Sequence, residues 1–228
     1  MTVDSHLYYL LAMLFSILGP LALSFDQKVN FKQHFGNLIK SIPLVAVCFI
    51  VGDVWYTHLG VWGFNANYHL PYKLFNLPLE EISFFLVVPY ACIFIYECLR
   101  SYFKIDLGSK QYGLIIFLIV LLLVGWMVTL GKLYTSVTIF GSIAILSWLY
   151  WKRQPFTDYL LVTYLVSIIP FMLVNGFLTG CCTPEPIVWY NDMENSGIRL
   201  LSIPIEDFSY SFNLISLNIL VFEFFKSK

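Results

Sequence analysis

Two stretches of the chain share one pattern: LPLEEISFFLVVPYACIFIYE at residues 77–97 and IPIEDFSYSFNLISLNILVFE at residues 203–223. They align without a gap, 126 residues apart, and each has a proline as its second residue and acids as its fourth and fifth residues. Proline and acidic residues are typical of a first helical turn, and the apolar run behind them is long enough to cross a bilayer. The pattern therefore predicts two copies of one membrane-spanning helix.

The composition of the whole chain indicates lipid as its solvent. Of its 228 residues, 59% are hydrophobic and only 12% are charged, whereas a soluble domain carries about 25% charged residues. The 13 basic and 14 acidic residues nearly balance, so nucleic acid is not an expected partner.

Apolar segments of about 20 residues, the length that crosses a bilayer, occur seven times. The first is not interpreted as a signal peptide, because its flank MTVDSH has no Lys or Arg and no cleavage site follows. The sequence predicts an all-α membrane protein with seven transmembrane helices, at 7–24, 38–56, 79–99, 112–130, 134–151, 158–178 and 205–225.

The repeated stretch extends to a larger unit. An aromatic loop precedes each copy, VWGFN at 61–65 and VWYND at 188–192, and the span before each loop ends in a short polar residue, Asp53 or Asn175. We therefore expect two three-helix repeats, 1–104 and 132–228, joined by a linker helix within 105–131. An even number of crossings separates the third span from the seventh, so the repeats run parallel and both acid pairs emerge at one face.

Basic residues predict the orientation of this bundle, because Lys and Arg favour the cytoplasmic side. Three of them, Lys73, Lys132 and Arg199, fall on the side of the acid pairs. The other ten fall on the opposite side. We expect an integral protein of a bacterial cell membrane, with the N-terminus outside and the C-terminus in the cytoplasm. Those ten residues are Lys28, Lys32, Lys40, Arg100, Lys104, Lys110, Lys152, Arg153, Lys226 and Lys228.

The candidate catalytic residues are the four acids Glu80, Glu81, Glu206 and Asp207 at the repeat interface, where membrane proteins with internal repeats commonly place their site. Neighbouring residues of a helix point about 100° apart, so one acid of each pair should face the cleft and the other a neighbouring helix. Acids at a helix start also have an ordinary role in complementing the helix dipole. Two copies behind two aromatic loops favour a function. Glu97 and Glu223, a helix length away, are interpreted as packing residues.

The chemistry that fits these residues is acid–base catalysis on an apolar substrate. The chain has no dinucleotide fingerprint, Walker loop or HExxH pair, and its histidines are scattered, so neither a cofactor nor a metal is expected. A carboxyl group in an apolar pocket or beside a second carboxyl can keep its proton, and aromatic faces stabilise a cation. The residues expected to bind substrate or stabilise a cation are Asp53, Trp62, Phe64, Phe84, Asn175, Trp189, Tyr190, Arg199 and Tyr210.

At these motifs the sequence resembles the integral-membrane, flavin-free lycopene cyclases of carotenoid biosynthesis, in their fused tandem-repeat form. The resemblance covers essentially the whole chain. Its specific points are LPLEEISFF at 77–85, NGFLTG at 175–180, VWYN at 188–191 and GIRLLSIPIEDFSYSF at 197–212.

The resemblance implies a lycopene β-cyclase that uses no flavin or NAD(P)H. A carboxylic acid protonates the terminal double bond of an acyclic ψ end group, the neighbouring double bond attacks the cation, and loss of a ring proton gives a β-ionone ring. Lycopene would become β-carotene by way of γ-carotene at one shared site. The implied partner is lycopene within the bilayer, and other enzymes of the pathway are further candidates. The catalytic carboxylates map to Glu80, Glu81, Glu206 and Asp207, and we expect Arg199 to keep one of them ionised.

A membrane transporter is the competing interpretation. Three spans, one linker and three parallel spans are also the layout of some carriers, and the four acids would then couple transport to protons. The position of both acid pairs at one face, away from the middle of the bilayer, favours the enzyme. A membrane isoprenoid transferase is a weaker alternative, because NDMEN at 191–195 is a poor match to paired DxxxD motifs.

Overall fold

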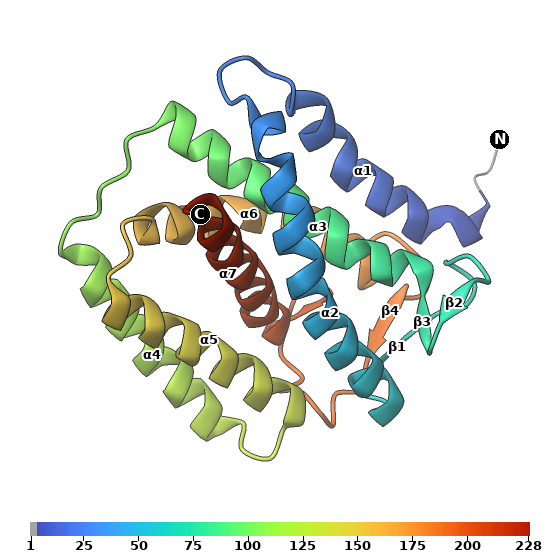
Figure 1. The fold of residues 1–228 in the computed structure, drawn as a ribbon. Helices are drawn as coiled ribbons and strands as arrows, with labels where there is room; N and C mark the ends of the chain where they lie inside the picture. The colour runs from blue at the N-terminus through green and yellow to red at the C-terminus, as the bar shows by residue number, and fades with distance from the viewer. Residues whose placement is uncertain (1–3) are drawn as a thin grey trace.

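The computed structural model describes residues 4–228, and within them seven helices have the length and composition of membrane spans (Figure 1). All seven predicted spans are confirmed, and the chain is an all-α membrane protein. The helices are α1 (Tyr8–Leu23), α2 (Phe35–Leu59), α3 (Leu79–Tyr102), α4 (Lys110–Val128), α5 (Leu133–Lys152), α6 (Thr157–Leu178) and α7 (Glu206–Lys226).

Each of the two predicted repeats packs one of its helices on the acid-bearing helix of the other. Helix α1 packs on α3, and its equivalent α5 packs on α7. Helix α2 of the first repeat packs on α7 of the second, while α6 of the second packs on α3 of the first. Helices α3 and α7 contact each other at the centre, and α4 packs mainly on α5. The arrangement gives the two acid-bearing helices equivalent surroundings built from both halves of the chain.

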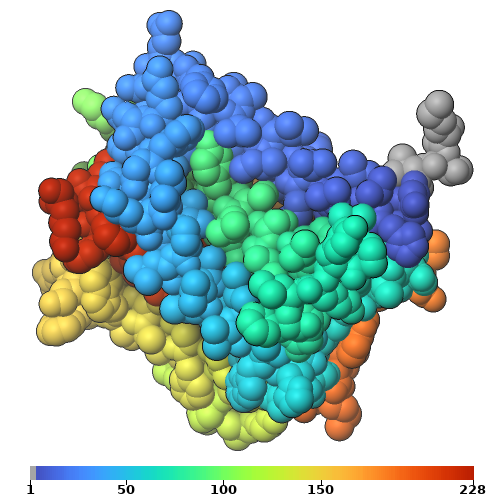
Figure 2. Space-filling model, turned by 45° about the vertical axis from the view of Figure 1, so that its right-hand side comes forward, coloured from blue at the N-terminus to red at the C-terminus, as the bar shows by residue number. Residues whose placement is uncertain are grey.

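The loops before α3 and α7 contain short strands that the sequence analysis did not predict. One antiparallel pair joins the two repeats, and each repeat adds a hairpin of its own that leads into the acid-bearing helix. Figure 2 shows the first hairpin and the start of α3 on the surface between α1 and α2. The joining pair is β1 (Trp62–Phe64) with β4 (Val188–Tyr190), and the hairpins are β2 (Lys73–Leu74) with β3 (Leu77–Pro78) and β5 (Arg199–Leu200) with β6 (Ile203–Pro204).

The joining pair explains one glycine in the first aromatic loop. Gly63 lies directly opposite Trp189 in the register of β1 and β4, and a Cβ atom at this position would overlap the indole ring of Trp189. The absence of a side chain therefore lets the two loops close over the ends of α3 and α7. We call this side of the bundle the loop end.

At the other end of the bundle, α3 and α7 form ion pairs with each other. Lys226 Nζ of α7 lies 2.6 Å from Glu97 Oε1 of α3, and Arg100 of α3 pairs with Glu223 of α7. His34 Nε2 lies 3.4 Å from the second oxygen of Glu97, which is 5% exposed. Glu97 and Glu223 thus contact residues of the opposite repeat, far from the acids of the loop end.

Removing the Glu97 charge should destabilise the bundle. Breaking one partner of a buried ion pair costs about 3–5 kcal/mol, so Glu97→Gln should lower the unfolding temperature of the detergent-purified protein. The matched control is Asp192→Asn, because Asp192 pairs with Arg199 while 58% of its side chain is exposed, and exposed pairs contribute about 0–1 kcal/mol. Equal unfolding temperatures for the two variants would contradict a structural role for the Glu97 pairs.

Candidate functional site

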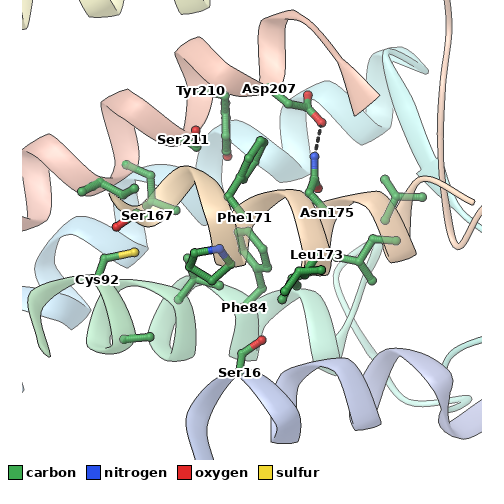
Figure 3. Close-up of a pocket in the computed structure, with 18 of the residues that line it drawn as sticks. Ser16, Phe84, Cys92, Ser167, Phe171, Leu173, Asn175, Asp207, Tyr210 and Ser211 are labelled. Atoms are coloured by element: carbon green, nitrogen blue, oxygen red, sulfur yellow. Dashed lines mark hydrogen bonds between the residues drawn. The ribbon is translucent and has the colours of Figure 1, made fainter. Parts of the chain in front are cut away.

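An apolar cavity of about 270 Å³ lies below the loop end, bounded by α1, α3, α6 and α7. Two acids reach its wall, Glu81 from α3 and Asp207 from α7. Most of the remaining lining is aliphatic or aromatic, including Phe84 and Phe171. Figure 3 shows Asp207 and Tyr210 on α7 above α6, with Phe84 of α3 on the opposite side of the cavity. The structure thus brings one acid from each repeat to a single hydrophobic space.

Glu81 accepts a hydrogen bond from the hydroxyl group of Tyr9. The carboxyl group of Asp53, in the last two turns of α2, lies within hydrogen-bonding reach of Glu81. Asp53 is 1% exposed; its Oδ1 accepts a 2.6 Å hydrogen bond from Trp62 Nε1, whereas its Oδ2 has no donor. Glu81 therefore has one hydroxyl donor and one carboxyl neighbour.

Asp207 has a different set of partners. Its Oδ1 accepts from the Tyr134 hydroxyl group at 2.6 Å. Its Oδ2 accepts from Asn175 Nδ2 at 2.7 Å and from the Tyr190 hydroxyl group at 2.9 Å. Burial and the adjacent Asp207 carboxylate hold the pKa of Tyr190, which lies in β4, well above its usual range, so this phenol stays protonated as a donor. Asp207 therefore has three donors and no carboxyl neighbour of the kind that Asp53 provides to Glu81.

The difference between the two acids comes from one pair of equivalent positions. Asp53 on α2 and Asn175 on α6 each stand beside the acid that lines the cavity. A carboxyl group there can share a proton with the acid, whereas an amide can only donate one of its own N–H groups. Two geometrically similar half-sites thus have different chemistry.

A cluster of aromatic rings lines the cavity beside the two acids. The Trp62 ring centroid lies 5.1 Å from that of Tyr134 and 6.0 Å from that of Tyr190. Tyr210 lies 6.1 Å from Trp62 and 6.2 Å from Tyr134. These four residues line the cavity, as does Phe64. Because these rings and both acids line the same cavity, the ring faces are available to attract a cation that forms there.

Glu80 and Glu206 face away from the cavity and hold the loops. Glu80 Oε1 accepts from the backbone N–H of Leu70 at 2.8 Å, and Glu206 Oε1 accepts from that of Ser196 at 2.7 Å. Thr135 also donates to Glu206, at 2.6 Å. The backbone donor lies ten residues before the acid in both repeats, so the contact is equivalent. A contact with a neighbouring helix was expected for the second acid of each pair. Glu206 makes one with Thr135 of α5, whereas Glu80 contacts the loop before α3 instead.

Trp189 and Arg199 lie outside the cavity wall. Trp189 is 43% exposed and covers Gly63. Arg199 Nη2 pairs with Asp192 at 2.6 Å, and its guanidinium lies 5.9 Å from the ring centroid of Tyr190. The carboxylate contact that was expected for Arg199 is made with Asp192, so Arg199 approaches the site only through the Tyr190 ring.

Two tyrosines that donate to the acids were missing from the sequence prediction. Tyr9 on α1 serves Glu81, and Tyr134 on α5 serves Asp207. An alignment of the first span with the fifth, 125 residues apart, would have paired the two tyrosines. The correspondence is weak in the sequence, because the outer helices are less similar to each other than the acid-bearing ones.

The comparisons with known proteins show the family of the chain. A family model described as lycopene cyclase matches residues 6–99 and 131–225, which contain both acid pairs and both aromatic loops. The two matched regions leave out the segment that holds α4. No curated protein and no solved structure matches the chain. Because the matched regions cover most of its length, the chain belongs to the lycopene cyclase family.

Proposed function

We propose that the chain is a lycopene β-cyclase that isomerises the ψ end groups of lycopene to β-ionone rings by proton transfer. The observation that carries the proposal is the meeting of Glu81 and Asp207, one from each repeat, in one apolar, ring-lined cavity. Membership of the lycopene cyclase family gives the class of reaction. A hydrocarbon substrate offers only double bonds, so catalysis has to begin with a proton donor and to stabilise a carbocation.

Glu81 is the proposed proton donor. It lies beside Asp53 in a buried setting, and two adjacent carboxylates in a medium of low dielectric cannot both stay ionised. The pair therefore holds a shared proton, which Glu81 delivers because it is the member that lines the cavity. The Trp62 N–H bond to Asp53 Oδ1 stabilises the charge left on the pair after the proton has been transferred.

Asp207 is the proposed base. Its three donors, Tyr134, Asn175 and Tyr190, favour the ionised form of the carboxylate. An ionised Asp207 first stabilises the positive charge across the cavity and then accepts the proton that the ring loses.

The reaction balances without a redox partner. Glu81 gives a proton to the terminal double bond, and a tertiary cation forms. The neighbouring double bond supplies the electron pair of the new ring bond, and loss of a ring proton to Asp207 restores a double bond. The proton is then returned to the Asp53–Glu81 pair, so substrate and product have the same composition.

The orientation we propose puts the loop end outside the cell and the C-terminus in the cytoplasm. Lys152 and Lys226 are the last residues of α5 and α7, and Arg100 lies two residues before the end of α3. All three are therefore at the end of the bundle opposite the loop end. The excess of basic residues there supports this orientation. The acids would then work near the outer surface of the bilayer.

Neutral replacements at the two cavity acids should abolish cyclisation. Positioned acid–base groups contribute about 10²–10⁴-fold to rate, so Glu81→Gln and Asp207→Asn should each lose at least about a hundredfold. The measurement is pigment analysis in a lycopene-accumulating bacterium, with the membrane level of each variant checked by immunoblot. The matched control is Glu80→Gln, which keeps an acceptor for the Leu70 N–H and should retain most activity. Full activity of Glu81→Gln would exclude it as the proton donor.

The shared proton can be tested at Asp53. The variant Asp53→Asn keeps an oxygen acceptor for Trp62 but lets an amide face Glu81, as Asn175 faces Asp207 in the other half. We expect the rate of cyclisation to fall at least about tenfold and its decline at high pH to begin at a different pH. An unchanged rate and pH profile would show that Asp53 holds no part of the catalytic proton.

Purified protein in lipid should cyclise lycopene without flavin or NAD(P)H, because the net reaction is an isomerisation. The assay compares product formed with and without added reduced flavin. A strict requirement for reduced flavin would refute the proposed chemistry. Solute uptake by proteoliposomes, without any change in the pigment, would instead favour the transporter.

A further inference from the structure

The cavity is elongated along α3. Its floor includes Glu81, Val88, Ala91 and Ile95, and the first and last of these lie about 21 Å apart at a rise of 1.5 Å per residue. Figure 3 shows Cys92 and Ser167 together at the deep end, away from Asp207. The space therefore has the shape of a trough that starts at the acids and continues toward the other end of the bundle.

The trough opens sideways between α1 and α6. Phe15 of α1 is 71% exposed and Leu173 of α6 is 64% exposed, and both line the cavity. The same two residues and Val174 also line an adjoining groove on the outer side of α1 and α6. Because these helices are membrane spans, the opening faces the hydrocarbon part of the bilayer.

The equivalent space beside α7 is filled. Ala91 and Cys92 on the floor of the trough correspond to Leu217 and Asn218 on α7. Asn218 is buried, and Leu217 is partly buried and packs against the hydrophobic core. Asn213 closes the gap toward α5, where it contacts Gly141 and accepts a 2.8 Å hydrogen bond from the Ser142 hydroxyl group. The pseudo-symmetric bundle thus has an open trough where α3 meets α1 and α6, and a packed interface where α7 meets α5.

We infer that the trough binds the polyene chain of the substrate, with one end group at Glu81 and Asp207 and the remainder leaving between α1 and α6 into the lipid. The inference rests on the proposed function and adds to it the binding mode. A dry cavity of about 150 Å³ holds benzene, so about 270 Å³ suits one end group and a short length of chain. The long polyene has to extend beyond the protein.

One trough also determines the order of events. Since the equivalent position on α7 is packed, the enzyme holds a single end group at a time. The monocyclic product has to leave through the opening, reverse and enter again before the second ring forms.

The opening is tested by Leu173→Trp, which places a large ring in the mouth of the trough. Its control is Val51→Trp on α2, the equivalent position in the other repeat, where Val51 is 65% exposed. We expect Leu173→Trp to lower the initial rate of the first cyclisation at least about tenfold and Val51→Trp to change it less than about twofold. Equal rates in the two variants, whether both normal or both low, would overturn the inference.

A second variant covers the case in which Leu173→Trp is poorly inserted. Ala91→Leu copies Leu217 onto the floor of the trough and should exclude the chain. Binding is read without turnover by the circular dichroism that achiral lycopene acquires on a chiral protein. Protein carrying Glu81→Gln should induce the signal, and adding Ala91→Leu should remove it. A signal that persists in the double variant would overturn the inference. If the wild-type protein binds lycopene but forms no ring, the proposed function is refuted and the inferred binding mode is not.

Release of the intermediate is tested by pulse and chase. Labelled lycopene is given briefly, and an excess of unlabelled lycopene follows. A trough that takes one end at a time predicts labelled monocyclic product in the lipid and a drop in labelled bicyclic product after the chase. Labelled bicyclic product that escapes dilution would show that both ends react without release, and would overturn the proposed order of events.

Discussion

The structure depends on burying carboxyl groups in a bundle whose solvent is hydrocarbon. An unpartnered charge in such a medium costs several kcal/mol, so every acid near the loop end has to find donors from other elements. Glu81 takes one from α1, and Asp207 takes three from α5, α6 and β4. The outer helices and the aromatic strands are thereby fixed around α3 and α7. The requirement that makes the acids chemically useful also organises the bundle.

Duplication gave the two half-sites one geometry, and single substitutions gave them different properties. The exchange of Asp53 for Asn175 places a carboxyl group beside one acid and an amide beside the other. At the position of Ala91 there is open space beside α3, whereas the larger Leu217 packs against the core at the equivalent position of α7. Both differences act beside the same helix, since Glu81, the neighbour of Asp53, and Ala91 are both residues of α3. An asymmetric reaction, with a donor and an acceptor of protons, can therefore occur within a nearly symmetric frame.

The sequence predicted the spans well because hydropathy over about 20 residues reports directly on burial in lipid. The equivalence of 77–97 and 203–223 also located the acids, and the ordinary geometry of a helix anticipated that only one of each pair faces the cavity. What it left open was which one. Glu80 and Glu81 are chemically alike, and their roles are separated by a backbone N–H ten residues earlier, at Leu70, which no side-chain pattern reveals.

Other features of the structure could not be predicted from the sequence for a similar reason. The pairing of β1 with β4 joins residues of different repeats through backbone hydrogen bonds, which leave little trace in composition. Arg199 was expected beside a catalytic carboxylate on sequence proximity alone. It forms an ion pair with the exposed acid Asp192 instead.

Helix α4 contacts the bundle mainly through α5, and much of its surface is exposed, including Phe117, Val124 and Met127. It supplies no wall of the cavity. Its contribution is topological: three crossings reverse the direction of the chain, and a fourth restores it so that the second half can be threaded the same way as the first. Selection on such a segment acts on its length and hydrophobicity more than on the identity of its side chains. Helix α4 should therefore tolerate substitutions that would abolish function in α3 or α7.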